Sequence, residues 1–438
     1  MGAESWFHSL WRIPRKHDAN SEKLVIGVLA FEIASLMSKV VNLWQSLSDK
    51  QIARLREETT DSIGLRKLIS DDENFIVRLI CVEKLENMAH VAESVARLGK
   101  KCSDPIWKGF ENAFYEFIAM GVDPYGWEFT GKKMEKNIKK MERFISTNAT
   151  LYQEMEQSLT RLKTNGESSV LDLIEYQKMV AWKTQEVKHL KDISLWNKTY
   201  DYTVHLLARS LFTIYRKISQ VFGVQEIVDV IYQKRNEIVD VGGIDNSSVL
   251  NSDLIHRSKF SALLQSPPPK TLGAAALALH YANVIIVIEK LAASPHLIGL
   301  DARKDLYNML PRRVTAALRG KLKPYTNTMA SSLGYDPSQA EEWTQAMSSL
   351  LEWLAPLAHH MIRWQSKRSF EQQSFVSRTN VLLVQTLYFA NQEKTEQVIT
   401  ELLVGLNYVW RYGMELNAKA LAECGSLRVD NGYPNLNG

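Results

Sequence analysis

Apolar residues recur every three or four positions along most of this chain, the spacing that places them on one face of an α-helix. A sustained alternation of apolar and polar residues, which would indicate a half-buried strand, does not occur in the sequence. We therefore predict an all-α fold, arranged as a multi-helix bundle or array. The expected helices run over about 21–47, 75–98, 105–120, 132–163, 169–190, 199–222, 271–293, from 338 onward, 380–389 and 395–424.

The segment Lys132–Lys163 has a hydrophobic period close to seven. Its apolar residues form two rows, offset by four and three residues, as in the seam of a coiled coil. Asn148 is the single polar interruption, and such a residue can set the register of paired helices. Two interpretations stay open: a long amphipathic helix packed inside its own domain, or a coiled coil that forms a homodimer or binds a partner. The rows are Met134, Met141, Asn148, Met155, Leu162 and Ile138, Ile145, Tyr152, Leu159.

A run of three prolines at Pro267–Pro269 supplies the clearest domain boundary. It follows a polar stretch, and three prolines in a row cannot continue a helix. We therefore expect two helical domains joined by a polar, proline-containing linker. The predicted parts are a mobile aromatic-basic arm (1–20), an N-terminal helical domain (21–241), the linker (242–270), a C-terminal helical domain (271–424) and a disordered tail (425–438).

Composition narrows the class of protein only slightly. The chain has 438 residues with 12 Pro and 21 Gly, and this scarcity of helix breakers favours long helices. A net charge of +4 is mild for this length and does not favour nucleic acid as a partner. Three widely separated cysteines argue against a disulfide framework and for a reducing, intracellular compartment. The apolar stretch Leu24–Met37 is too short to span a bilayer and contains Glu32, so we expect a buried core helix.

No motif in the sequence carries catalytic chemistry, and we expect no catalytic residue, bound metal or cofactor. Gly126–Lys133 has the spacing of a phosphate-binding loop, but Lys133 stands where Ser or Thr would bind magnesium. His359 and His360 are neighbours on a predicted helix, so they point about 100° apart and cannot both serve one metal without a special geometry. His280 and Asn283 are expected to be buried polar residues, and His280 to make a buried hydrogen bond.

Two basic clusters could contact an anionic surface. One lies in the predicted helix 132–163, and the other accompanies aromatic residues in the N-terminal arm. Gly2 could accept a myristoyl group, although Trp6 stands where the usual motif has Ser or Thr. The alternatives are a solvated helix face for the first cluster and nuclear import for the arm. The basic residues are Arg12, Arg15, Lys16, Lys132, Lys133, Lys136, Lys139, Lys140 and Arg143.

Several segments match a known family in their residues and not only in their composition. In the C-terminal half they are Thr271–Asn283, Arg303–Pro311, Trp353–Met361, Val381–Ala390 and Glu401–Tyr408; in the N-terminal half they are Ile26–Ala34 and Leu43–Leu47. The C-terminal segments resemble the domain of unknown function 668, and the N-terminal ones resemble the domain of unknown function 3475. This pair of domains, in this order, is similar to the layout of the plant PSK simulator family, of which the chain would be a divergent branch.

The resemblance implies a link to plant growth and to phytosulfokine peptide-hormone signalling, and it transfers no catalytic residue. We expect a non-enzymatic helical interaction or scaffold protein of plant growth or stress signalling, with protein partners on its helical surfaces. Alternatives are a peripheral membrane adaptor anchored through Gly2 and the basic-aromatic segments and, more weakly, an unrecognised enzyme. The expected location is the plasma-membrane periphery or the nucleus, otherwise the cytosol. Family-motif residues expected to be structural are His280, Tyr281, Asn283, Arg303, Asp305, Tyr307, Pro311, Trp364, Gln365 and Asn407.

Overall fold

The computed structural model describes residues 24–123, 125–164, 170–223, 268–294, 298–328, 335–371 and 381–429. Within these ranges the chain consists of helices and their connections, with two isolated β-bridges and no named strand. The predicted all-α fold is therefore confirmed. Tertiary contacts divide the chain into two units, each with its own hydrophobic core. The predicted arm and almost all of the predicted linker lie outside the described residues.

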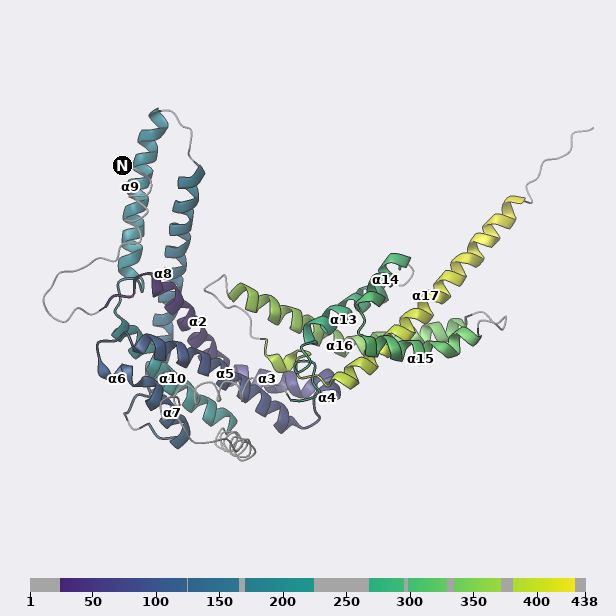
Figure 1. The fold of residues 1–438 in the computed structure, drawn as a ribbon, viewed down its shortest axis with the longest axis horizontal. Coiled ribbons are helices and arrows are strands. Elements are labelled where there is room, and N and C mark those ends of the chain that lie inside the picture. The colour runs from purple at the N-terminus through teal and green to yellow at the C-terminus, as the bar shows by residue number, and fades with distance from the viewer. Residues whose placement is uncertain are drawn as a thin grey trace, which may run out of the picture. The chain divides into compact units, whose positions relative to one another are not determined.

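Unit 1 is built around the apolar helix α2. Ala30, Ile33, Ala34, Met37 and Val40 of this helix are completely buried. The stretch Gly27–Ser46 is the one described segment long and apolar enough to cross a bilayer, and 61% of it is buried inside the fold. The helices α8 and α9 run side by side as a long hairpin (Figure 1). The elements that lie wholly or mostly in unit 1 are η1 (Gly27–Leu29), α2 (Ala30–Ser46), α3 (Asp49–Asp61), α5 (Glu73–Gly99), α6 (Pro105–Lys108), α7 (Phe110–Met120), α8 (Gly131–Thr164), α9 (Val170–Ile193) and α10 (Tyr200–Phe222).

The seven-residue pattern of α8 corresponds to packing within unit 1. Met134, Met141 and Asn148 are completely buried, and α8 packs against α2 and α9. The Asn148 side-chain amide donates to the Phe144 carbonyl of its own helix at 2.7 Å. As far as Met155, most residues of the heptad rows are thus buried by neighbours in the same chain, as the first interpretation expected, while Tyr152 is exposed. A homodimer through Lys132–Lys163 remains an untested prediction.

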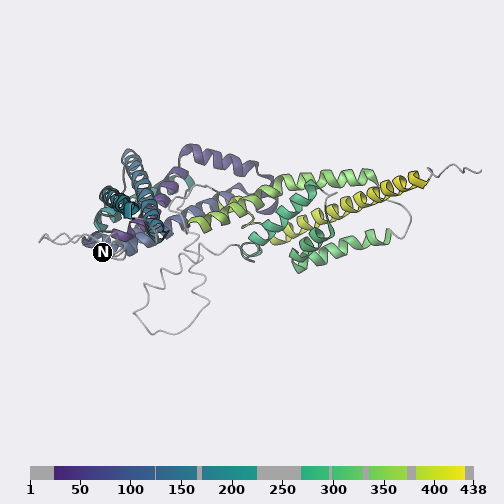
Figure 2. The ribbon, with the colours of Figure 1, turned by 90° about the horizontal axis from the view of Figure 1, so that it is seen from above.

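Unit 2 contains the C-terminal helices and a short piece of the N-terminal half. Its elements are α4 (Ile63–Leu68), α13 (Ala278–Ala293), α14 (Leu300–Met309), α15 (Arg312–Thr328), α16 (Pro337–Glu371), η3 (Leu383–Gln385) and α17 (Gln392–Val429). Figure 2 shows α15 alongside α17. Tyr281, Ile285, Val314, Leu354 and Leu402 are fully buried and come from four different helices, so the core joins α13, α15, α16 and α17.

The short helix α4 packs in unit 2, although it precedes the predicted C-terminal domain by some two hundred residues. A Cβ atom added at Gly64 would lie 2.7 Å from the Trp353 carbonyl oxygen, so only glycine allows this approach to α16. Lys67 lies over the Trp353 ring, and the Asn391 amide donates to the Leu68 carbonyl at 2.8 Å. Contacts therefore place Glu57–Ile76 with unit 2, whereas the sequence placed it in the domain 21–241.

Two helices begin later than the hydrophobic pattern predicts, and the cause is the same in both. In unit 1, Val25 forms a bridge with Thr199, and α2 starts only at Ala30. In unit 2, Thr271 forms a bridge with Asn391, and α13 starts at Ala278 instead of Thr271. The preceding backbone groups pair with a distant segment and are unavailable to a helix.

The predicted helix 380–389 is wrong for the same reason. The Leu272 and Gly273 amides donate to the Ala390 and Tyr388 carbonyls at 2.9 and 2.8 Å. A Cβ at Gly273 would lie 2.7 Å from the Tyr388 carbonyl oxygen, so the glycine allows the two segments to meet. The 381–391 segment is therefore irregular, with the one-turn helix η3 inside it.

Three further helix ends differ from the prediction. The helix expected over 105–120 is divided at Gly109 into α6 and α7. The helix expected from 338 onward begins at Pro337 as α16, and the Asp336 side chain caps it by accepting from the Ser338 amide at 3.0 Å. The last helix continues to Val429, into the segment predicted as a tail from 425.

Candidate functional site

A cavity of about 410 Å³ opens between α14, α15 and α17 in unit 2. Its volume lies in the range of sites that hold small molecules. Most of its wall is aliphatic, and Leu300 at the start of α14 is 75% exposed there, unusual for so large an apolar side chain. The apolar lining residues are Leu291, Ile298, Leu300, Leu306, Leu310, Leu318, Leu322, Leu403, Leu406 and Trp410.

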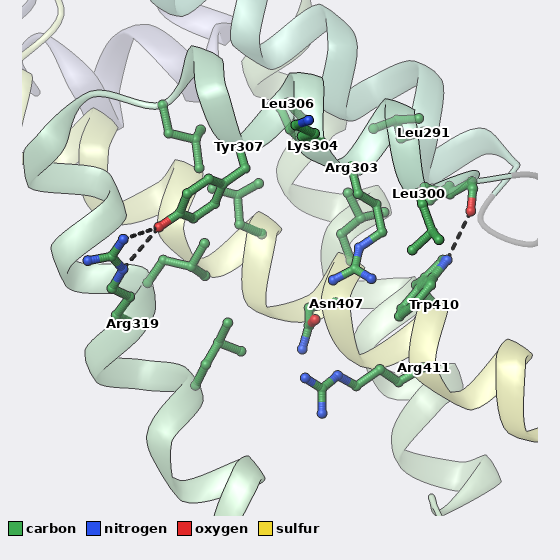
Figure 3. Close-up of a pocket in the computed structure, with 16 residues that line it drawn as sticks. Leu291, Leu300, Arg303, Lys304, Leu306, Tyr307, Arg319, Asn407, Trp410 and Arg411 are labelled. Atoms are coloured by element: carbon green, nitrogen blue, oxygen red, sulfur yellow. Dashed lines mark hydrogen bonds between the residues drawn. The ribbon is translucent and has the colours of Figure 1, made fainter.

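The polar groups at one end of the cavity are Arg303, Asn407 and Arg411, whose side chains end close together (Figure 3). The Arg303 guanidinium carbon lies 3.7 Å from the centre of the Trp410 ring. Trp410 is itself held by a hydrogen bond from its indole nitrogen Nε1 to the Ile298 carbonyl at 3.0 Å. A cation stacked on a fixed indole is therefore built into the wall.

Arg303 and Arg411 also repel each other. Burial lowers the pKa of the Arg303 guanidinium below its ordinary value, and the charge of Arg411 lowers it further. Arg411 reaches the Tyr335 hydroxyl at 3.4 Å through Nη1. The Arg303 guanidinium keeps its charge at neutral pH because arginine has a very high pKa. No acidic residue lines the cavity, so this end of it has a positive potential.

The opposite side of the cavity carries a second donor group. Arg319 of α15 donates through Nε to the Tyr307 hydroxyl of α14 at 2.9 Å, and Figure 3 shows the two side chains directed toward each other. Lys304 lines the same cavity. Within the described part of the chain, Arg303, Lys304 and Arg319 form no ion pair with a carboxylate. The cavity lining contains four basic residues and no Asp or Glu.

The structure brings together three of the residues predicted from the family motifs: Arg303, Tyr307 and Asn407 line the cavity. Sequence reasoning missed Trp410 and Arg411, although both directly follow a motif segment. Lys304 and Arg319 were also missed as site residues, although Lys304 lies within the motif segment Arg303–Pro311. The signal that could have identified Arg303 and Tyr307 together is their spacing of four residues, which places both on one face of α14.

Other predicted motif residues contribute to packing or to backbone conformation and lie outside the cavity. The His280 ring nitrogen Nε2 lies 2.7 Å from the Met309 carbonyl, in a half-buried place. Pro311 begins the turn into α15, and Asn283 and Asp305 are exposed, so the expectation that Asn283 is buried is wrong. Trp364 and Gln365 are half-buried on α16. These positions explain conformation and packing, and none of them lines the cavity.

Tyr281 belongs to a buried network that joins α13 to α17. Its hydroxyl donates to Glu396 Oε1 at 3.0 Å, and Gln392 donates to the same oxygen at 2.7 Å. Arg313 Nε lies 3.4 Å from the other oxygen of Glu396. Burial raises the pKa of the Tyr281 hydroxyl, and the hydrogen bond to Glu396 raises it further. The network stabilises the packing of unit 2, because each buried polar group in it has a partner.

The predicted basic cluster of α8 forms one exposed face of that helix in unit 1. Successive helical positions are about 100° apart, so the six basic residues fall within an arc of about 120°. The two acidic residues of the run are bound on the α2 side: Glu135 accepts from Trp44 Nε1 at 2.7 Å, and Glu142 accepts from Gln45 at 2.9 Å. The α8 basic face consists of Lys132, Lys133, Lys136, Lys139, Lys140 and Arg143.

The remaining candidates are placed as follows. Gly2, Arg12, Arg15 and Lys16 lie outside the described residues. In the segment Gly126–Lys133, the Trp127 carbonyl accepts from Arg209 Nε at 2.8 Å, and the preceding element is the helix α7 rather than a strand.

The two neighbouring histidines of α16 contact different partners. His359 Nε2 lies 2.7 Å from Glu289 Oε2, while His360 Nδ1 lies 3.2 Å from the Gln385 carbonyl. Across the described ranges, no group of three or more His, Cys, Asp or Glu side chains is placed to hold a metal ion.

Two family models match the chain. Residues 28–84 match a domain of unknown function (DUF3475), and residues 271–363 match a protein of unknown function (DUF668). The second match includes α13, α14, α15 and most of α16, so it covers the α14 and α15 sides of the cavity but not α17. No solved structure matches the chain.

Three curated relatives from Arabidopsis thaliana extend the similarity to most of the chain. Protein PSK SIMULATOR 1 is 27% identical over 414 residues, which is 88% of this chain and 56% of the relative. Protein PSK SIMULATOR 3 is 28% identical over 411 residues, with the same coverage of 88% and 56%. Protein PSK SIMULATOR 2 is 24% identical over 406 residues, or 87% of this chain and 59% of the relative. The chain thus spans little more than half the length of these relatives.

Proposed function

Because this chain belongs to the PSK simulator-like family, with its two domains of unknown function in the family's order, we propose that it takes part in phytosulfokine-related plant growth signalling. We propose further that it does so by binding, as a helical interaction or scaffold protein without catalysis of its own. The names of the relatives and the descriptions of the two matched families mention no enzymatic reaction.

The observation that carries the binding role is the chemistry of the cavity in unit 2. Its polar lining consists of Arg, Lys, Tyr and Asn side chains above an aliphatic wall. Guanidinium and ammonium groups donate hydrogen bonds and attract negative charge. Such a lining supports recognition of an anion, and it contains no carboxylate, cysteine, serine or histidine.

The growth response to phytosulfokine peptide tests this proposal. Seedlings that lack the gene are expected to elongate their roots less in response to added peptide than wild-type seedlings do. Complementation with the wild-type chain should restore the response, and so should the control variant Arg312→Gln, which removes an exposed arginine outside the cavity. A full response in seedlings without the gene would contradict the signalling role.

A second candidate function, peripheral membrane attachment, is favoured by the α8 basic face. Its six cations are exposed, and in the described part of the chain none of them forms an ion pair with a carboxylate. A polybasic face of this kind is attracted to anionic lipid headgroups, and each basic residue near the surface strengthens binding by roughly fivefold at low salt. In the intact protein Gly2 and the N-terminal arm would add to this attachment.

Sedimentation with vesicles tests the second function. Purified protein is expected to bind vesicles that contain phosphatidylserine and not vesicles of phosphatidylcholine alone. Lys136→Gln, Lys139→Gln and Arg143→Gln together should weaken binding by roughly a hundredfold at low salt. The matched control removes three exposed lysines elsewhere in unit 1, Lys50, Lys100 and Lys188. An equal loss in both triple variants would show that net charge matters and the α8 basic face does not.

A further inference from the structure

The cavity of unit 2 combines two properties that a simple basic surface lacks. It is concave, with a volume of about 410 Å³, and its cations stand beside an aliphatic wall instead of facing open water. The α8 basic face is convex and has its apolar residues on the opposite, buried side of the helix. A ligand that fits the cavity must therefore offer both a negative charge and an apolar surface.

The charged end of the cavity favours an anionic group. Arg411 lies near enough to Arg303 for its charge to lower the pKa of the Arg303 guanidinium, and no acidic residue lines the cavity. Asn407 ends beside both guanidinium groups (Figure 3) and adds an amide that can donate a further hydrogen bond. Planar guanidinium groups bind carboxylate and phosphate oxygens in pairs, so a bound anion would relieve the repulsion and satisfy these donors.

The rest of the wall favours a hydrocarbon or aromatic body. Leu306, Leu318, Leu403 and Leu406 are buried or nearly buried residues whose side chains reach the cavity from three helices. Leu300 remains 75% exposed at the opening, a position that an apolar ligand would cover. Covering aliphatic surface in this way is favourable, because it removes apolar area from water.

We propose that this cavity binds an amphipathic anion, with its carboxylate, phosphate or sulfate head at Arg303, Asn407 and Arg411 and its apolar body along the leucine wall. This inference rests on the proposed role of the cavity as a binding site, and it does not depend on the link to phytosulfokine. Free acids with a hydrocarbon chain and phosphate-headed lipids share this chemistry, and the experiment below separates them.

Displacement of a fluorescent probe from the purified full-length chain tests the proposal. The probe is anilinonaphthalene sulfonate, which joins an aromatic body to a sulfonate and becomes fluorescent in apolar sites. Monomeric dodecanoate and dodecyl phosphate should displace it, whereas dodecyltrimethylammonium, with the same chain and the opposite charge, and acetate, with a head and no body, should not. Tighter binding of dodecanoate than of dodecyl phosphate assigns a free acid, and tighter binding of dodecyl phosphate assigns a phosphate-headed lipid. Equal displacement by dodecyltrimethylammonium, or none by either anion, would overturn the proposal.

Variants locate the binding within the molecule. Arg411→Gln and Arg303→Gln should each weaken probe binding at least roughly tenfold, since each removes charge-assisted hydrogen bonds to the head group. Arg303→Lys keeps the charge and the stacking position but loses the fork of donors, so an intermediate loss is expected. Arg312→Gln should bind as the wild type does, and circular dichroism should show all four variants folded. Unchanged affinity in both folded glutamine variants would overturn the assignment.

The two levels of the proposal fail in different ways. A cavity variant that loses probe binding but still supports the growth response would leave the ligand assignment intact. It would also show that binding of this ligand is separate from signalling. A reduced growth response in seedlings lacking the gene, together with no displacement by any amphipathic anion, would leave the signalling role and refute the ligand class.

Discussion

The α8 basic face and the cavity of unit 2 use the same side chains for different purposes. Each gathers Lys and Arg side chains, and no Asp or Glu lines the cavity. On α8 the cations project into water from a convex helix whose apolar side is already buried against α2 and α9. In unit 2 they border a hollow whose apolar wall is open. The difference teaches that charge alone does not define a ligand; the apolar surface beside the charge decides between an extended anionic surface and a small amphipathic molecule.

The two regions also differ in how strongly water screens their charges. Water screens the exposed cations of α8, and salt weakens their attraction further. Arg303 is partly removed from water, stacked on Trp410 and close to a second arginine. Its interaction with a bound anion would be less screened and more dependent on geometry. Substitutions in one region should therefore leave the ligand of the other unaffected.

The largest expected effect follows from Gly405→Ala in α17, the helix that supplies Leu403 and Leu406 to the cavity. A Cβ at this position would lie 2.8 Å from the Trp343 ring and 3.0 Å from Met347 Cγ. Overpacking of this kind costs about 1–3 kcal/mol and exceeds the helix-propensity gain of about 1 kcal/mol. We expect a lower free energy of unfolding and weaker probe binding, measured by denaturant unfolding and fluorescence, with vesicle binding unchanged.

The matched control is Gly413→Ala in the same helix, where an added Cβ meets no atom within 4 Å. This variant should be as stable as the wild type or more stable by up to about 1 kcal/mol. Equal stability of the two alanine variants would contradict the close packing of α17 on α16 at Gly405.

A smaller effect is expected from Tyr307→Phe. This change removes the hydroxyl that accepts from Arg319 and leaves the ring in place. Arg319 then loses the hydrogen bond that holds its side chain at the edge of the cavity. A hydrogen bond of this kind contributes about 1 kcal/mol, which corresponds to roughly fivefold in affinity for the probe. Probe titration should show weakening of at most this size, while vesicle binding stays the same. A loss as large as that of Arg411→Gln would mean that the head group lies at Tyr307 instead.

The smallest effect is expected in maleimide labelling of the two buried thiols of unit 1. This measurement also serves as a folding control for the other variants. Burial raises the pKa of the Cys81 thiol to about 12, and burial together with the nearby charges of Asp201 and Asp104 raises that of the Cys102 thiol to about 12. At pH about 8 both should resist alkylation by maleimide in the native protein, because the thiolate is the reactive form. Peptide mapping should show no change in the cavity variants and full labelling after denaturation.

The sign of the pH dependence follows from the same shifts. The folded protein holds these thiol protons more tightly than the unfolded chain, whose ordinary value is 9.0. Their contribution to the free energy of unfolding is therefore complete below pH about 9 and decreases as the pH rises toward 12. Labelling of Cys81 in a cavity variant near neutral pH would reveal unfolding of unit 1 and disqualify that variant as a test of the cavity.

Much of the fold could be predicted because helical periodicity is a local property. The α5 pattern, the seam of α8 and the stop at Gly121, which adopts the left-handed conformation after α7, follow from residues within a few turns of one another. The family resemblance was also readable from short segments, and both matched domains confirm it. The segments 271–277 and 380–389 were predicted wrongly, because their backbones pair with each other across more than one hundred residues.

The site could be predicted only in part. Arg303, Tyr307 and Asn407 stood out through motifs, yet their common cavity depends on the packing of α14 against α17. Trp410 and Arg411 carried no signal of their own, since an aromatic residue beside a basic one is ordinary on a helix. The α8 basic face was visible as a run of lysines, but the binding of Glu135 and Glu142 to α2, which leaves that face purely basic, required the structure.

The sequence by itself determined the all-α class, the spans of the long helices and the family, because these depend on local spacing and on short characteristic segments. Tertiary structure alone decided where α2 and α13 begin, that α4 packs in unit 2, and that the basic residues of unit 2 surround an apolar hollow. The physical reason is the same in each case. Each of these features depends on contacts between residues far apart in the chain: paired backbone segments, a close approach at a glycine, or like charges held near one another. The free energy of such contacts depends on a geometry that no local pattern contains.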